Sequence, residues 1–541
     1  MERLPFEILT QIVSYLPNPD DELNPYRRGS SLKNGPERRR VLQTRPAIAC
    51  VSRKLQQAVE QFTFSEVTVK CANTDQFAAN IDQFATIFFQ PRRHYRRLFL
   101  KRLTFHIELG LFYAIAPEKS RLAENSHVTR SFSSLFALLA TWGADPAVGF
   151  KLFFEIYPNF NLNGDYHSDL YTPFIQINNP KDTLSPLSCI TFINGNRFGR
   201  RLHPASLAAL TDRAGAGPNS RLERAEWTHT EPRAFIGLAR DIRRDLAAVL
   251  QTIQLPSSMR HLDLSIDTED RPHTDRLLDF TFPQPPGRDS LCSAFHRMIA
   301  SSKVERLSFI GPVDRSLFLP GPDANSSSEC TELPIWPSVR EFAVGLDQAA
   351  PSGRWYFKRP KKNGPFRGYH HPGNMPLPSD DLILWDVRPP CYSRDRPAWG
   401  SEEEQDTWDE EREVAIEYYE SMADRGGVDF RSVPDDEFML PLLSAFARSI
   451  ARMPALEEAH LQSCLASPHK RDVGWMVDYC APWKPYKWNR QSEHESDLAS
   501  PRVIFDVGNE WRPSEEVLDL FREVGSKKYG RDTVLEFVIR R

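Results

Sequence analysis

The chain has 541 residues, 40% of them hydrophobic and 11% aromatic, so we expect most of it to be globular rather than disordered. Its 68 basic and 72 acidic residues give a net charge of -4, which argues against a general nucleic-acid or membrane-surface binder. The 8 cysteines form no CxxC pair, and we find neither a secretory leader nor a run of about 18 apolar residues. We therefore expect an intracellular protein, in the cytoplasm, the nucleus or both, without a membrane span.

Two short helices and a strand are predicted at the start of the chain. Pro5 suits the first turn of a helix, and Pro17 ends that helix. A second helix follows Pro46, with apolar residues every three or four positions, and the stretch FTFSEVTV at residues 62–69 alternates as a strand does. The apolar positions of the two helices are Ile8, Leu9, Ile12, Leu16, Ile48, Val51, Leu55 and Val59.

Helices of this length bury too little apolar surface to be stable alone. Part of that surface must therefore contact either the rest of the chain or another protein. Periodicity alone favours packing against the rest of the chain, because an apolar helix face is usually part of a core.

The first residues carry a family resemblance. Leu4-Pro5 and the helix after it, followed by IACVSRKLQQAVEQFTFSEV, resemble the F-box of the large fungal F-box protein family. In that family the motif docks on a Skp-type adaptor of a cullin-RING ubiquitin ligase. The resemblance implies an F-box helical module over residues 1–68, in which Val51, Leu55 and Val59 are partly interface and partly core. It implies these adaptor-binding residues: Leu4, Pro5, Ile8, Leu9, Ile12, Leu16, Val51 and Leu55.

The module departs from the family pattern at two places. An insertion at residues 18–44 is longer than the usual linker and contains Arg38-Arg39-Arg40. Leu55 stands where the family often has tryptophan. Either difference would lower the affinity for the adaptor.

Helices and strands are predicted to alternate over residues 69–541. Helices are expected at 233–253, 291–300, 438–451 and 513–525, the last ending at Gly525. Strands are expected at 100–105, 187–192, 259–266, 303–310, 339–344, 455–461 and 533–539. Because the spacing between strands is uneven, we expect an α/β fold in the form of a degenerate leucine-rich-repeat-like solenoid with long loop insertions. The alternative is an ordinary α/β domain with a mixed sheet.

A long insertion is predicted at about residues 345–436, where the chain becomes rich in Pro and Gly and then acidic. Such a stretch is usually a solvated loop. The sharper hypothesis is that Trp355, Tyr356 and Phe357 are aromatic anchors that contact a substrate protein. The phrases IWPSVREFAV, GRWYF and PLLSAFARSIARMPAL resemble the same fungal family but leave the substrate open. The basic stretch at 92–102 is interpreted as a solvated helix end in preference to an anion site.

The sequence gives no positive evidence for an enzyme. It contains none of the GxxxxGK[ST], GxGxxG, HExxH or GxSxG motifs. His370-His371 is interpreted as a chance pair, and Cys464 and Cys480 as structural thiols. We expect no metal, no cofactor and no catalytic residues, with an unrecognised hydrolase or transferase as the alternative.

The family resemblance therefore implies a substrate-recruiting F-box subunit of a cullin-RING ligase. The N-terminal helices would bind the adaptor, and the remaining domain would bind a target protein. Such a subunit acts by proximity and needs no catalytic residue of its own. The alternative is an interaction scaffold outside any ligase, in which a degenerate F-box only caps the first repeat.

Overall fold

A computed structural model describes most of the chain. The described residues are 8–9, 49–71, 74–109, 117–143, 147–158, 174–195, 201–217, 219–231, 236–268, 288–319, 335–358, 433–464, 474–485, 498–507 and 511–538.

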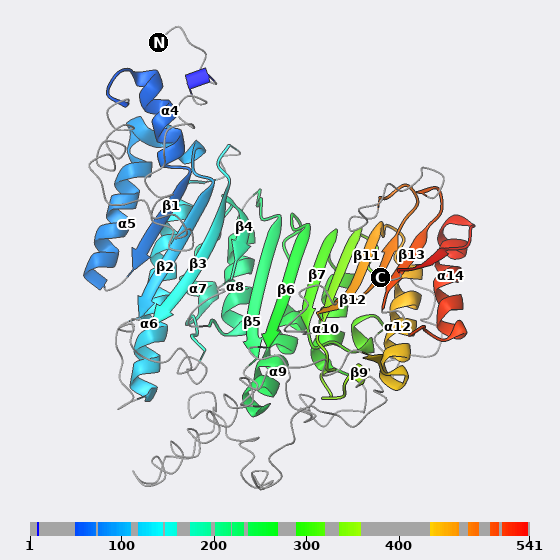
Figure 1. Cartoon of the computed structure of the whole chain (residues 1–541). Coiled ribbons are helices and arrows are strands. Elements are labelled where there is room, and N and C mark those ends of the chain that lie inside the picture. The colour runs from blue at the N-terminus through cyan, green and yellow to red at the C-terminus, as the bar shows by residue number, and fades with distance from the viewer. Residues whose placement is uncertain are drawn as a thin grey trace, which may run out of the picture.

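One large sheet of 12 strands organises the molecule, and its strands lie side by side in the order in which they occur in the chain (Figure 1). Strand β12 is antiparallel to both of its neighbours, and every other neighbouring pair is parallel. The strands are β1 (Glu66–Cys71), β2 (Arg102–Leu109), β3 (Phe150–Pro158), β4 (Ile190–Asn194), β5 (Arg224–Glu231), β6 (His261–Thr268), β7 (Arg306–Gly311), β8 (Glu341–Leu346), β11 (Glu458–Cys464), β12 (Gly474–Cys480), β13 (Arg502–Asp506) and β14 (Val534–Phe537). The short strands β9 (Phe357–Lys358) and β10 (Val433–Pro434) pair separately.

Helices cover one face of this sheet. In Figure 1 the helices α8, α9, α10 and α12 lie behind the strands, whereas the face toward the viewer carries no described helix. We call this second face the open face. The helical segments are α4 (Arg53–Thr63), α5 (Thr74–Phe89), η3 (Pro91–Leu98), α6 (Pro117–Ala140), α7 (Pro180–Thr183), α8 (Pro204–Gly215), α9 (Ile236–Thr252), α10 (Ser290–Ala300), η5 (Arg315–Leu317), α12 (Asp436–Ala451) and α14 (Glu515–Tyr529).

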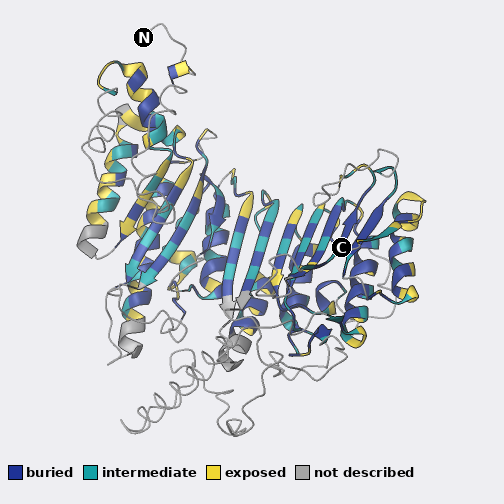
Figure 2. Ribbon diagram, in the orientation of Figure 1, coloured by how far each residue is buried: buried dark blue, intermediate teal, exposed yellow. Residues whose placement is uncertain are grey.

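The core lies between the sheet and these helices. Alternate residues of each strand point into it, as in β2, where Leu103, Phe105 and Ile107 are buried and the residues between them are partly exposed. The ring of Phe105 meets that of Phe132 on α6 edge to face at 5.5 Å. Figure 2 shows this alternation as dark and light bands along the strands. The apolar core is continuous from Val69 on β1 to Val524 on α14.

The structure confirms the α/β class and several predicted elements. The helices expected at 233–253, 291–300 and 438–451 appear as α9, α10 and α12. All seven expected strands coincide, with shifted ends, with β2, β4, β6, β7, β8, β11 and β14.

Two boundaries predicted from the sequence are wrong. Phe62 belongs to α4, and β1 begins only at Glu66 and pairs with β2, so the strand expected from residue 62 begins four residues later. Gly525 lies inside α14, which continues to Tyr529 and ends at Gly530 in a left-handed conformation with φ 66°. A Cβ at position 525 would lie 2.4 Å from the carbonyl oxygen of Arg531, so Gly525 permits close packing and does not end the helix.

Candidate functional site

The described part of the N-terminal module has a small apolar core of its own. Helix α4 begins at Ser52, whose hydroxyl accepts a hydrogen bond from the backbone N–H of Leu55 at 3.2 Å. On the following turns Leu55, Ala58 and Val59 are buried together with Leu9 of the preceding segment. This cluster is separate from the main core of the sheet domain.

Two apolar side chains in the described part of the module face outward. Ile8 is 41% exposed and Val51 is 62% exposed. Leu9 and Leu55, expected on the adaptor-binding surface, are buried at 0% and 2% exposure, so they pack inside the module instead. The other expected adaptor-binding residues lie outside the described residues; they are Leu4, Pro5, Ile12 and Leu16. The insertion at 18–44 also lies outside them.

A buried ion pair joins the module to the sheet domain. Arg96 of η3 binds Glu60 of α4 through two nitrogens, one at 3.0 Å, and the hydroxyl of Tyr95 donates to the same carboxylate at 2.7 Å. Burial alone would raise the pKa of Glu60, but hydrogen bonds from Arg96, Tyr95 and Gln56 hold it below its usual range. Arg96 also lies 4.6 Å over the ring of Phe64. The basic stretch at 92–102 is therefore not only a solvated helix end, because one of its arginines forms this junction.

The three proposed aromatic anchors are buried. Trp355, Tyr356 and Phe357 are at most 5% exposed. The hydroxyl of Tyr356 donates to the carbonyl of Val313 at 2.8 Å, and the ring of Phe357 meets Trp475 edge to face at 5.9 Å. Their burial contradicts the anchor hypothesis, because side chains that complete the core present no surface to a substrate. Residues 359–432 of the predicted insertion lie outside the described residues.

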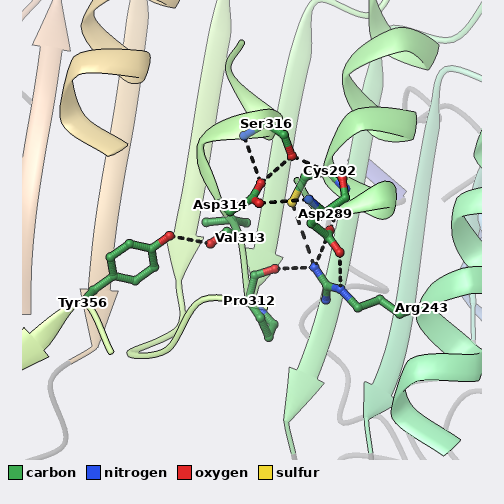
Figure 3. A network of polar contacts seen from close by, with 8 residues as sticks. All are labelled: Arg243, Asp289, Cys292, Pro312, Val313, Asp314, Ser316 and Tyr356. Atoms are coloured by element: carbon green, nitrogen blue, oxygen red, sulfur yellow. Dashed lines mark hydrogen bonds and ion pairs between the residues drawn. The ribbon is translucent and has the colours of Figure 1, made fainter. Parts of the chain in front are cut away.

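A buried polar network lies beside these aromatic residues (Figure 3). Arg243 of α9 binds Asp289 through two bonds of 3.0 and 2.8 Å and donates to the carbonyl of Pro312 at 2.8 Å. Asp289 caps α10 by accepting from the backbone N–H of Cys292, and its own N–H donates to Asp314 at 2.9 Å. These bonds hold α9, α10 and the segment after β7 together, so the network stabilises the fold.

The buried thiols are poor nucleophiles. Burial and the carboxylates of Asp289 and Asp314 raise the pKa of Cys292 well above its usual range. Cys71 lies 3.0 Å from the hydroxyl of Ser131 and 3.6 Å from Nε2 of His127, an arrangement with the residue types of a nucleophile and a base. Burial nevertheless raises the pKa of Cys71 to about 11, so the protonated thiol dominates at neutral pH.

The other expected chemical groups offer no site within the described ranges. His370-His371 lies outside these ranges, and Cys480 is buried in β12. No group of three or more metal-ligating side chains occurs among the described residues. The described helices include none with the length and apolar character needed to cross a bilayer.

Ion pairs run along the edge of the open face where the parallel strands begin. Each of the following arginines is neutralised by a carboxylate on a neighbouring strand or the segment before it. The pairs are Arg224 with Asp263 at 2.9 Å, Arg260 with Glu305 at 3.2 Å, Arg306 with Glu341 at 3.2 Å and Arg340 with Glu457 at 2.7 Å. This part of the edge is charged but internally balanced.

The same edge differs at β2 to β5, where cations lie over aromatic rings. The guanidinium of Arg102 lies 4.1 Å from the ring centre of Phe153, and that ring packs 5.1 Å from Phe192. The ammonium of Lys151 and the guanidinium of Arg224 lie 5.9 and 5.4 Å from the ring centre of Phe192. We call these five residues the cation–aromatic cluster. Sequence reasoning missed it, although Lys151 and Phe153 alternate with buried residues in β3.

No family model, curated protein or solved structure matches this chain. The described structure offers two surfaces with the chemistry of binding: the exposed apolar side chains of the N-terminal module and the cation–aromatic cluster of the open face.

Proposed function

We propose that the protein is a substrate-recruiting F-box subunit of a cullin-RING ubiquitin ligase. The observation that carries this proposal is the outward position of Ile8 and Val51 on a module that has its own buried core. Apolar side chains that are not needed to close a core are available to a partner protein. The partner in this proposal is a Skp-type adaptor, as the F-box resemblance implies.

The proposed target-binding part is the domain that follows the module. Its strands lie in chain order and its described helices cover one face, which supports a degenerate leucine-rich-repeat-like solenoid with long insertions. The junction between Glu60 and Arg96 supports a fixed geometry between module and sheet. A rigid connection would hold a bound target at a constant distance from the adaptor.

In this mechanism the protein raises the effective concentration of a target near the ubiquitin-loaded enzyme of the ligase. Burying one aliphatic side chain contributes about 1.5 to 3 kcal/mol before association costs are subtracted. Ile8 and Val51 would therefore supply part of the adaptor affinity. The rest would come from residues of the F-box motif such as Leu4 and Ile12.

The test is co-purification with a Skp-type adaptor. The double variant Ile8→Asp, Val51→Asp places charges on the proposed interface and should abolish co-purification. Its unfolding transition should match that of the wild type, because both side chains are exposed. The matched control is Ile310→Asp, which changes an isoleucine that is 47% exposed on β7 of the sheet domain.

Two results would count against the proposal. One is a wild-type protein that binds no Skp-type adaptor, and the other is a double variant that binds it as well as the control does. Either result would favour the interaction scaffold over the ligase subunit.

A further inference from the structure

The cation–aromatic cluster lies on the open face next to the strand that follows the N-terminal module. We propose that it is a docking site for a short acidic segment, rich in Asp and Glu, of a partner protein. The inference deepens and rests on the proposed function, because that partner would be the recruited substrate.

The cluster differs in charge from the rest of the edge. Arg306 of β7 and the arginines just before β6 and β8 are neutralised by carboxylates of this chain, and so is Arg224, the cluster residue at the β5 end. Arg102 and Lys151 are exposed, and no carboxylate of the described residues forms an ion pair with either. Their charges are therefore available to carboxylates of another molecule.

Arg102 is also preorganised for binding. Stacking on Phe153 restricts the guanidinium of Arg102 to the surface of the sheet, while its N–H groups have no acceptor among the described residues. An arginine held in this way loses less conformational entropy when it forms a bidentate bond to a carboxylate. The half-exposed ring of Phe153 also offers contact to an apolar residue of the same segment.

The spacing of the cluster fits an extended segment. Arg102 and Lys151 are direct partners across β2 and β3, and Lys151, Phe192 and Arg224 continue the same row onto β4 and β5. With roughly 4.8 Å between strands, the row spans about 14 Å. An extended peptide places alternate side chains about 6.8 Å apart, so the row matches about five residues of a crossing segment. Arg102 and Lys151 supply two adjacent cations to carboxylates of the segment, and the half-exposed ring of Phe153 offers contact to a residue between these carboxylates.

Neighbouring carboxylates limit what can bind. Glu66 lies beside Arg102 on β1, and Glu226 and Asp263 surround Arg224 at the other end. A long nucleic acid would carry its phosphates past the cluster and toward these carboxylates, as well as toward a chain with a net charge of -4. A short acidic segment can end before it reaches these carboxylates.

The test measures binding of a labelled peptide with alternating Glu and Leu to the purified full-length chain by fluorescence polarisation. The wild type should bind this peptide, with an affinity that falls as salt is added. It should bind the same peptide with Gln in place of Glu at least roughly tenfold more weakly, because charge-assisted hydrogen bonds are lost. A single-stranded RNA oligonucleotide should bind more weakly than the acidic peptide.

The variants separate the cluster from general charge. Arg102→Gln with Lys151→Gln should weaken peptide binding by roughly tenfold or more. The matched control Arg306→Gln removes a paired arginine of the same face and should leave binding unchanged. Glu66→Gln should strengthen binding, because it removes the neighbouring negative charge.

Four results would overturn the inference. In three of them the wild type binds no acidic peptide, binds the Gln peptide as tightly as the Glu peptide, or binds the RNA more tightly than the acidic peptide. The fourth is a control, Arg306→Gln, that loses as much peptide affinity as the double variant of Arg102 and Lys151. The variant Ile8→Asp, Val51→Asp should bind the peptide as the wild type does. Loss of adaptor binding therefore does not imply loss of peptide binding, and the two proposals can be rejected separately.

Discussion

The pKa values of two aspartates in the buried polar network are shifted in opposite directions. Burial opposes ionisation of Asp289, but Arg243 holds its pKa below the usual range. Burial and the charge of Asp289 raise the pKa of Asp314 to about 6. Because this folded-state pKa lies above the unfolded value of about 3.9, the contribution of Asp314 to stability is fully present below about pH 4 and is lost as pH rises through about 6.

The variant Asp314→Asn tests this linkage. A shift of about two units corresponds to at most about 3 kcal/mol. Between pH 4 and 7, the free energy of unfolding of the wild type should fall relative to the variant by up to that amount. Urea denaturation at a series of pH values measures the difference. Asp519→Asn, on the exposed side of α14, is the control, and parallel pH profiles for wild type and Asp314→Asn would refute the assignment.

At the scale of elements, α4 depends on η3 for its orientation. Arg96→Gln removes one partner of a buried ion pair and leaves the carboxylate of Glu60 without its cation. Such a change costs roughly 3 to 5 kcal/mol when the remaining charge stays buried. We expect faster amide hydrogen exchange in α4. The exchange of β6 should not change, because β6 and α4 are not in contact. The control Arg306→Gln should leave exchange in α4 unchanged.

The elements predicted best from the sequence are amphipathic helices followed by an apolar strand. Helix α9 and strand β6 illustrate this, because their buried residues recur with clear periods, as with Ile242 and Leu246 in the helix and Leu262 and Leu264 in the strand. Strand β5, with the sequence RAEWTHTE, was missed because its open face is charged and its buried positions include a histidine. Strands β12 and β13 were also missed, since consecutive residues are buried in the second half of β12 and in most of β13, which weakens the alternation.

Only part of the candidate site was predictable. The periodicity of the first helix does not tell which apolar residue turns outward, as Ile8 does, and which turns inward, as Leu9 does. The cation–aromatic cluster joins residues from β2 to β5 that are more than 100 positions apart at its ends. Their contact depends on strand order and register, which periodicity does not provide.

At the scale of the whole molecule, a large continuous core runs through the described part of the sheet domain, and the module has a small separate core. Leu264→Ala removes a fully buried side chain from the large core and should lower the free energy of unfolding of the sheet domain by about 2 to 5 kcal/mol. Leu55→Ala should loosen α4 without moving the main unfolding transition. Thermal unfolding followed by circular dichroism, together with amide exchange in α4, distinguishes the two effects. A shift of the main transition by Leu55→Ala would show that the cores are coupled.

The chain-order arrangement of the strands has a consequence for biosynthesis. Each of β1 to β8 pairs with the strand made just before or just after it, so the first pairs need no residues from the C-terminal half. These pairs would be able to form while the ribosome is still translating β11 to β14. The last strands, where β12 reverses direction, would then complete a sheet whose earlier part already exists.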